Sequence, residues 1–248
     1  MTSLQYLDLI FNAFAGTIPP SIGALTALRV LLLFENRLTG PIPASIGTTK
    51  ALTVLSLDTN SLSGSIPSTI GDLTDLVQVS LYRNRLTGTI PSSLGALQSL
   101  SYLNIDSNSL VGTIPSSMGT VTSLELITLV GNALTGSIPS SLGLLTRLTY
   151  LDLSSNLLSG TIPSSISSLT LLSGLKLQNN FLTMGSATTV PPSTFSLATQ
   201  KGNLDMNVNC LAYTSNFVPG HNTTPTHCKC KNTLLFLLLQ CIPIHDKM

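Results

Sequence analysis

The 248-residue sequence has few charged residues, no tryptophan, and no cysteine or histidine before position 210. Only 8% of the residues are charged, with 11 Lys and Arg against 10 Asp and Glu. A charge so sparse and so balanced creates no field that would hold nucleic acid or an anionic membrane surface. We therefore expect partners to be recognised through local contacts, and we expect no nucleic acid among them.

Patterns for catalysis and metal binding are also missing. The sequence contains no glycine-rich phosphate loop, no His-Glu-x-x-His and no Gly-x-Ser-x-Gly. The three histidines and four cysteines, which supply most metal ligands and nucleophiles, all lie at or beyond residue 210. We predict that the protein is not an enzyme, with no catalytic residues, no metal and no cofactor.

One pattern fills most of the chain instead. Residues 100–115 read LSYLNIDSNSLVGTIP, which corresponds to LxxLxLxxNxLxGxIP with Ile105 in a leucine position. The first leucine of this pattern recurs every 24 residues without a change of register, at Leu4, Leu28, Leu52, Leu76, Leu100, Leu124, Leu148 and Leu172. Eight copies in phase predict a solenoid whose coils bury their apolar residues against one another.

This pattern resembles that of leucine-rich-repeat proteins. The Gly-x-Ile-Pro after the asparagine resembles the plant-type subclass, found in receptor-like ectodomains and polygalacturonase-inhibitor-like proteins. The resemblance implies a right-handed, α/β horseshoe-like solenoid of eight 24-residue repeats, with a parallel β-sheet on its concave face. It further implies short 3-10 or helical turns on the convex face and a second small sheet around Gly-x-Ile-Pro.

Polar and glycine positions in the repeat have structural roles in this interpretation. An asparagine amide both donates and accepts hydrogen bonds, so we expect it to bond backbone groups of its own coil and the next coil. These asparagines are Asn12, Asn36, Asn60, Asn84, Asn108, Asn132, Asn156 and Asn180. Segments such as Ser93-Leu94-Gly95 predict short helical turns with serine as the cap. The glycine before Ile-Pro, as at Gly112, is expected where the chain bends.

The variable strand positions project from the concave face and contain the candidate binding site. Coils two to five combine three aromatic side chains with charges of both signs, and aromatic and arginine residues dominate interface energetics. We call these residues the recognition patch: Phe34, Glu35, Asp58, Tyr82, Arg83, Tyr102, Asn104 and Asp106. As an alternative, Arg83 lies diagonally between Asp58 and Asp106, and the three could form only an exposed ion cluster.

The repeat pattern ends near residue 183, after which the composition changes. We predict a solenoid over residues 1–183, a C-terminal cap over 184–231 that carries Cys210, Cys228 and Cys230, and an apolar tail over 232–248. The tail is too short for a membrane helix, which needs about 20 apolar residues. It would serve as a packing strand or lie outside the mature protein, and it is a poor match to a lipid-anchor signal.

The cap carries the predicted modifications. A disulfide between Cys210 and Cys228 is our first choice, with Cys230 to Cys241 as a second bridge, although four cysteines allow three pairings and the sequence does not choose among them. A zinc site that adds His227 is disfavoured, because Cys-x-Cys lacks the usual ligand spacing. Asn222 begins the one Asn-x-Thr pattern of the chain and is a candidate glycosylation site.

These features favour a non-catalytic binding module that recognises a protein, a peptide or a cell-wall carbohydrate outside the cell or on its surface. Two alternatives are an inhibitor of a secreted cell-wall-degrading enzyme and the sensing fragment of a receptor kinase. The first residues already belong to a repeat strand, so we expect a signal peptide and an N-terminal cap to be missing from this copy. Membrane association would then need a missing segment, and no oligomeric state is predicted.

Overall fold

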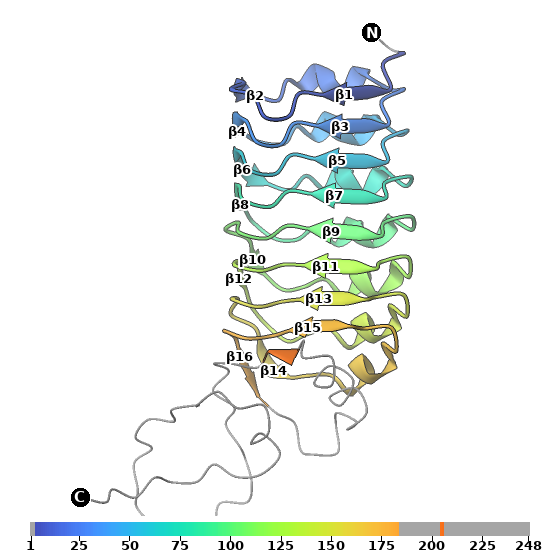
Figure 1. The fold of residues 1–248 in the computed structure, drawn as a ribbon, viewed down its shortest axis with the longest axis vertical. Coiled ribbons are helices and arrows are strands. Elements are labelled where there is room, and N and C mark those ends of the chain that lie inside the picture. Colours follow the sequence, from blue (N-terminus) through green and yellow to red (C-terminus); the bar gives the residue numbers. More distant parts are fainter. Residues whose placement is uncertain (1–2, 184–203, 206–248) are drawn as a thin grey trace, which may run out of the picture.

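The computed structural model describes residues 3–183 and the backbone of residues 204–205. The chain forms a stack of coils, and each coil contributes one strand to a parallel nine-stranded sheet (Figure 1). Each strand pairs with the equivalent strand of the next coil, so that Leu7 lies opposite Leu31 and Leu151 opposite Leu175. In order across the sheet the strands are β1 (Tyr6–Asp8), β3 (Val30–Leu32), β5 (Val54–Ser56), β7 (Gln78–Ser80), β9 (Tyr102–Asn104), β11 (Leu126–Thr128), β13 (Tyr150–Asp152), β15 (Gly174–Lys176) and β17 (Leu204–Asp205). The predicted solenoid with a parallel sheet is confirmed.

The large sheet continues beyond the eighth repeat. Strand β17 pairs in parallel with β15, with Leu204 opposite Leu175, although no repeat was recognised in this part of the sequence. Apart from β17, the predicted cap and the apolar tail lie outside the described residues. The same holds for Cys210, Cys228, Cys230, Cys241 and Asn222.

The Gly-x-Ile-Pro region forms return strands, as expected, but in three short sheets and not in one. In the first sheet are β2 (Ala15–Thr17), β4 (Arg37–Gly40), β6 (Ser61–Ser65) and β8 (Arg85–Thr87). The other two sheets pair β10 (Val111–Gly112) with β12 (Ala133–Leu134), and β14 (Ser159–Thr161) with β16 (Phe181–Thr183). Gly112 has a φ of +76°, which only glycine adopts without strain.

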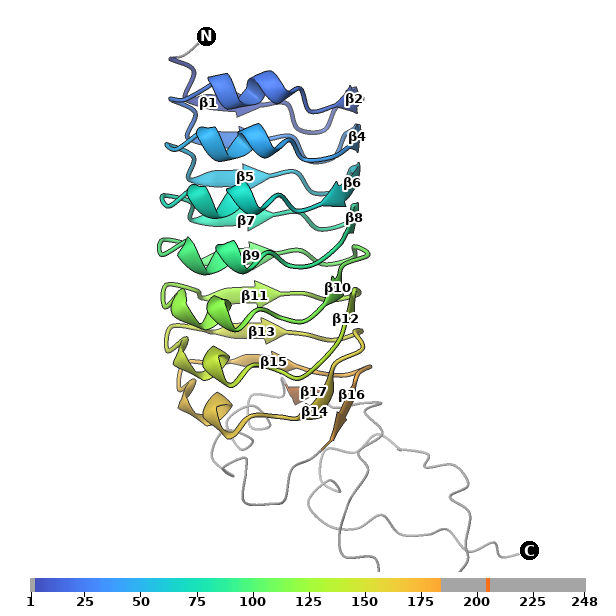
Figure 2. The same cartoon turned by 180° about the vertical axis from the view of Figure 1, so that it is seen from behind.

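The opposite side of each coil is a 3-10 helix, and these helices cover the far face of the large sheet (Figure 2). They are η1 (Pro20–Ala24), η2 (Ala44–Thr48), η3 (Ser68–Asp72), η4 (Ser92–Ala96), η5 (Ser116–Thr120), η6 (Ser140–Leu144) and η7 (Ser164–Ser168). None of the helices in the described part of the chain has the length and hydrophobicity needed to cross a bilayer.

The prediction that serine caps these helices was wrong. Pro91 occupies the cap position of η4, and no side chain caps the helix. The hydroxyl of Ser93 instead donates to the carbonyl oxygen of Ser68 in the preceding coil, at 2.6 Å. Neighbouring helices are packed so closely that a Cβ atom on Gly95 would lie 2.6 Å from the carbonyl oxygen of Ser117. Serine and glycine therefore join adjacent coils here, while proline sets the start of the helix.

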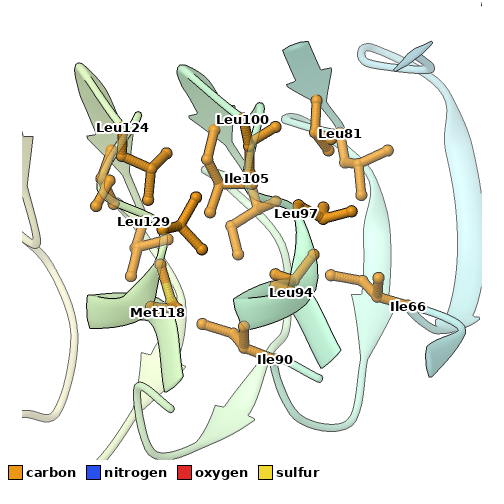
Figure 3. Close-up of a cluster of buried hydrophobic side chains, with 14 of the residues drawn as sticks. Ile66, Leu81, Ile90, Leu94, Leu97, Leu100, Ile105, Met118, Leu124 and Leu129 are labelled. Atoms are coloured by element: carbon orange, nitrogen blue, oxygen red, sulfur yellow. The ribbon is translucent and has the colours of Figure 1, made fainter. Parts of the chain in front are cut away.

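The core is a continuous layer of apolar side chains between the large sheet and the helices. Leu81, Leu97, Leu100 and Ile105 are at most 1% exposed and pack together across neighbouring coils (Figure 3). Burying one leucine contributes about 1.5–3 kcal/mol relative to exposure. In the first coil Leu7 is only partly buried, because no described coil covers its outer side. Each coil therefore depends on its neighbours for most of its burial.

The asparagines link each coil to the preceding one. Asn108 donates through Nδ2 to the carbonyl oxygens of Leu81, at 3.0 Å, and Ile105, at 3.1 Å. Its Oδ1 accepts the N–H of Leu86 at 3.0 Å. The sequence analysis had placed the second partner in the next coil, but Leu81 and Leu86 both belong to the coil before. Asn12 lacks a preceding coil among the described residues, and its side-chain amide donates only to carbonyl oxygens of its own coil.

We predict that Asn108→Ala lowers the free energy of unfolding by about 2–3 kcal/mol, because it leaves backbone groups of two coils without partners. Asn12→Ala is the matched control and should cost clearly less, since the Asn12 side chain is exposed and its hydrogen bonds stay within its own coil. Urea denaturation followed by circular dichroism measures both. Equal losses for the two variants would contradict a role of the asparagine in joining coils.

Candidate functional site

The concave face of the large sheet carries the recognition patch on adjacent coils. Four of its side chains each follow the end of a strand by two residues. They are Phe34 after β3, Asp58 after β5, Tyr82 after β7 and Asp106 after β9. The sheet hydrogen bonds continue past these positions, as from the N–H of Arg83 to the carbonyl oxygen of Asp106, at 2.9 Å. Parallel strands are spaced by about 4.8 Å. The four side chains therefore form one row across four coils.

The next position in each coil turns the chain away from the sheet. Glu35 and Arg83 have φ values of +54° and +52°, in the left-handed region that few non-glycine residues adopt. Both side chains are exposed. The guanidinium carbon of Arg83 lies 6.0 Å from the ring centroid of Tyr82, at the limit of a cation–π contact. Tyr82 and Arg83 thus form an accessible pair at the centre of the patch.

The alternative of an ion cluster around Arg83 was wrong. Among the described residues the ion pairs are Lys50 with Asp72, Arg147 with Glu125, and Lys176 with Asp152, and Arg83 takes part in none of them. Asp58 is only 3% exposed and accepts a hydrogen bond from the Ser56 hydroxyl, at 2.6 Å. The charge of Arg83 remains available to a partner.

The environment of Asp106 changes the pKa of its carboxyl. Burial raises the pKa of its carboxyl to about 6. The Val130 N–H, which donates to Oδ1 at 2.7 Å, and the Thr128 hydroxyl both lower this pKa, while the charge of Asp152 raises it. Burial also raises the pKa of Tyr82, and the negative charge of Asp58 adds to this effect.

Two further patch residues lie within β9 itself. Asn104 accepts the N–H of Asp106 through Oδ1, at 3.0 Å, and donates through Nδ2 to the hydroxyl of Tyr102, at 3.4 Å. Both side chains are half-buried. The amide of Asn104 therefore links the hydroxyl of Tyr102 to the backbone N–H of Asp106.

The sequence analysis missed a second group on the same face, in coils seven and eight. Tyr150 donates its hydroxyl to Asp152 Oδ2, at 3.2 Å. The ammonium of Lys176 lies 3.8 Å from the same oxygen and 5.7 Å from the centroid of the Tyr150 ring. The recurrence of tyrosine two residues before an acid or amide, as in Tyr102-x-Asn104 and Tyr150-x-Asp152, could have revealed this group.

Part of the concave face in the first two coils is apolar. The rings of Phe11 and Phe34 meet edge to face, with centroids 5.3 Å apart and planes at 80°. Leu32 in β3 is half-buried beside them on the same face. No group of three or more metal-ligating side chains occurs within the part of the chain that the structure describes. The geometry fits noncovalent recognition of a ligand with an apolar and a polar part.

We predict that Asp106 destabilises the fold as pH rises. Its native pKa of about 6 lies above the ordinary value of 3.8. The native state therefore keeps this proton longer than the unfolded state does, and stability falls between about pH 4 and pH 6 by at most about 3 kcal/mol. Asp106→Asn should be more stable than the native chain at pH 7, with no difference at pH 4. Urea denaturation at several pH values measures this, and a difference that does not vary with pH would contradict it.

Comparisons with known proteins agree with this architecture. One family model described as leucine rich repeat matches residues 50–110. A second model with the same description matches residues 3–25 and 147–169. No curated protein matches the chain.

Solved structures give closer parallels. The plant peptide hormone receptor RGFR1, in complex with RGF2, is 38% identical, with 73% of this chain and 29% of that chain covered and a TM-score of 0.72. The Arabidopsis receptor kinase HAESA, in complex with the peptide hormone IDA and the co-receptor SERK1, is 35% identical, with coverages of 84% and 34% and a TM-score of 0.77. A plant ice-binding protein is 34% identical, with coverages of 73% and 57% and a TM-score of 0.64.

The chain spans about a third of the length of these two receptor structures. Its 24-residue period, its parallel concave sheet and its Gly-x-Ile-Pro return strands agree with the matched family and with these structures. The chain is therefore a member of the leucine-rich-repeat proteins, with repeats of the type found in plant receptors.

Proposed function

We propose that the chain is a non-catalytic module that binds a protein or peptide along its concave face, through the recognition patch. The observation that carries this proposal is the gathering of Tyr82 and Arg83 with Phe34 and Tyr102 on the one face of the large sheet that no helix covers (Figures 1 and 2). Aromatic and arginine side chains supply most of the binding energy at protein interfaces. The structures of RGFR1 and HAESA, both in complex with peptide hormones, support a peptide as the partner.

The dimensions of the face suit a short extended segment. Coils two to five span three strand intervals, or roughly 14 Å, and an extended chain advances about 3.3 Å per residue. A peptide that crosses the strands would therefore place about four or five residues over the patch. Its apolar residues would lie over Phe34 and its polar residues over Asp106.

We predict that the double variant Tyr82→Ala with Arg83→Ala loses about thirtyfold in affinity for a peptide selected from a library against the native chain. Arg85→Ala with Phe181→Ala is the matched control, since both side chains are exposed but belong to the return strands. Calorimetry or surface plasmon resonance measures both variants. Native affinity in the first variant would remove the patch as the binding site.

An extracellular or cell-surface location belongs to the same proposal. It is supported by the receptors among the structural neighbours and by a sequence with only 8% charged residues. An inhibitor of a secreted cell-wall-degrading enzyme and the sensing part of a receptor kinase would use the same face. Capture of such an enzyme by the purified chain would favour the first alternative, and a kinase segment in the longer gene would favour the second. Binding to wall oligosaccharides would add carbohydrate as a partner.

A second candidate function, ice binding, is supported by the return strands of coils five to eight. Exposed and half-buried hydroxyl groups form a periodic row along these strands, beside the exposed apolar side chains of Val111, Leu157 and Phe181. No ionisable side chain lies within residues 109–113, 133–137, 157–161 and 181–183. The hydroxyl groups of this row belong to Ser109, Thr113, Thr135, Ser137, Ser159, Thr161 and Thr183. One structural neighbour is described as an ice-binding protein.

We predict for this candidate that the purified chain slows ice growth and that Thr135→Lys abolishes the effect by placing a charge in the row. Thr146→Lys is the control, because Thr146 is exposed in the turn after η6 and lies outside the row. Thermal hysteresis and recrystallisation assays measure the activity. Ice growth that is the same with and without the native chain would remove this candidate.

A further inference from the structure

We propose that the concave face contains a cation subsite, formed by Asp106 and Thr128 with the ring of Tyr102, that receives the ammonium or guanidinium group of a basic residue in the bound peptide. The inference rests on the proposed function, since it assumes a peptide along this face. It adds the chemistry of one ligand residue and the place where that residue binds.

The first observation is a buried hydroxyl without a hydrogen-bond partner. Thr128 ends strand β11 and is 7% exposed, and its Oγ1 makes no hydrogen bond of acceptable geometry with any described residue. In the sheet register it lies between Asn104 and Asp152. Buried polar atoms almost always have partners, because desolvation without a hydrogen bond is unfavourable. The Thr128 hydroxyl faces the Asp106 carboxyl, and the lone pairs of its oxygen lack a donor that a ligand could supply.

The second observation is the charge that surrounds this hydroxyl. Thr128 lies close enough to Asp106 for its hydroxyl to lower the pKa of that carboxyl. Asp106 accepts the Val130 N–H and forms no ion pair among the described residues, while Asp152 adds a second negative charge nearby. A cation at this point would meet an unneutralised carboxylate and a free hydroxyl oxygen together.

The third observation is that the same sheet already holds an ammonium between a carboxylate and a tyrosine ring. Lys176 lies opposite Asp152 in the register, with its ammonium beside that carboxylate and over the Tyr150 ring. Two coils earlier, Tyr102 is the equivalent of Tyr150, Asn104 of Asp152 and Thr128 of Lys176. The carboxylate there comes instead from Asp106, two residues beyond Asn104. The shorter threonine supplies no cation. A basic residue of the ligand would therefore supply the charge that Lys176 supplies in coil eight.

The other charged and titratable groups around the subsite are compatible with this assignment. Tyr82 and Val130 flank Asp106 along the row, and Arg83 lies beside Tyr82 without an ion pair to Asp106. Lys176 is engaged with Asp152. Asp106 is therefore a carboxylate beside Thr128 that no cation of the described residues neutralises, and its protonation in acid would remove the charge that attracts the ligand.

The test uses the whole chain, isotopically labelled, with n-butylammonium and methylguanidinium as probes for lysine and arginine side chains and n-butanol as the neutral probe. At pH 7.5 we expect at least one cation to shift the amide signals of Thr128 and Val130 in a saturable way, with no shift from butanol. Asp106→Asn should weaken this binding at least tenfold, and Thr128→Val should weaken it severalfold. At pH 5 the native chain should bind about tenfold more weakly, because most of Asp106 is then protonated.

Asp75→Asn is the matched control, since Asp75 is exposed and lies outside the concave face. It should leave probe binding unchanged. Binding to Asp106→Asn as tight as to the native chain, or equal shifts from butanol, would overturn the subsite. If a selected peptide needs Tyr82 but not Asp106, the proposed function stands and the subsite fails. If the cations bind as expected but no peptide does, the subsite stands and the proposed function fails.

Discussion

The stacking of one 24-residue coil directly against the next is the constraint on which the rest of the structure depends. Leu100 is buried only because coils lie on both sides of it, whereas Leu7 in the first coil remains partly exposed. The same closeness leaves no room for a Cβ atom on Gly95 and brings Asn108 within reach of the preceding backbone. Since most coils meet the same kind of neighbour, these positions carry the same residue types in nearly every repeat, and Ser167 replaces the glycine only in the seventh.

That constraint leaves the outward positions of the concave strands free to vary, and the binding chemistry is found there. The coils still influence these residues, because a side chain in a row has neighbours about 4.8 Å away on each side. Asp58 and Asp152 are nearly covered by such neighbours and find partners within their own coils. Asp106 is also partly covered but accepts one backbone N–H and forms no ion pair among the described residues. Similar acids in the same sheet thus have different hydrogen-bond and ion-pair partners.

The comparisons show how little the fold by itself says about the ligand. Two peptide hormone receptors and an ice-binding protein share this solenoid at 34–38% identity. The helices, core and return strands perform the same structural task in each coil, so they do not distinguish these functions. Only the variable residues of a particular face can therefore distinguish one function from another, here Tyr82, Arg83 and Asp106 on the concave sheet.

The sequence by itself determined the repeat, its 24-residue period, the parallel sheet and the membership of the recognition patch in adjacent coils. These follow from the spacing of Leu100, Leu103 and Asn108, because a periodic sequence that must bury one face allows few arrangements. Only the tertiary structure decided that Asn108 reaches back to Leu86, that Ser93 joins two coils, and that Arg83 avoids Asp58. It also decided that Thr128 is left without a partner next to Asp106. Such details depend on distances between atoms of different coils. A difference of one carbon atom in the length of a side chain can change these distances while the repeat pattern stays the same.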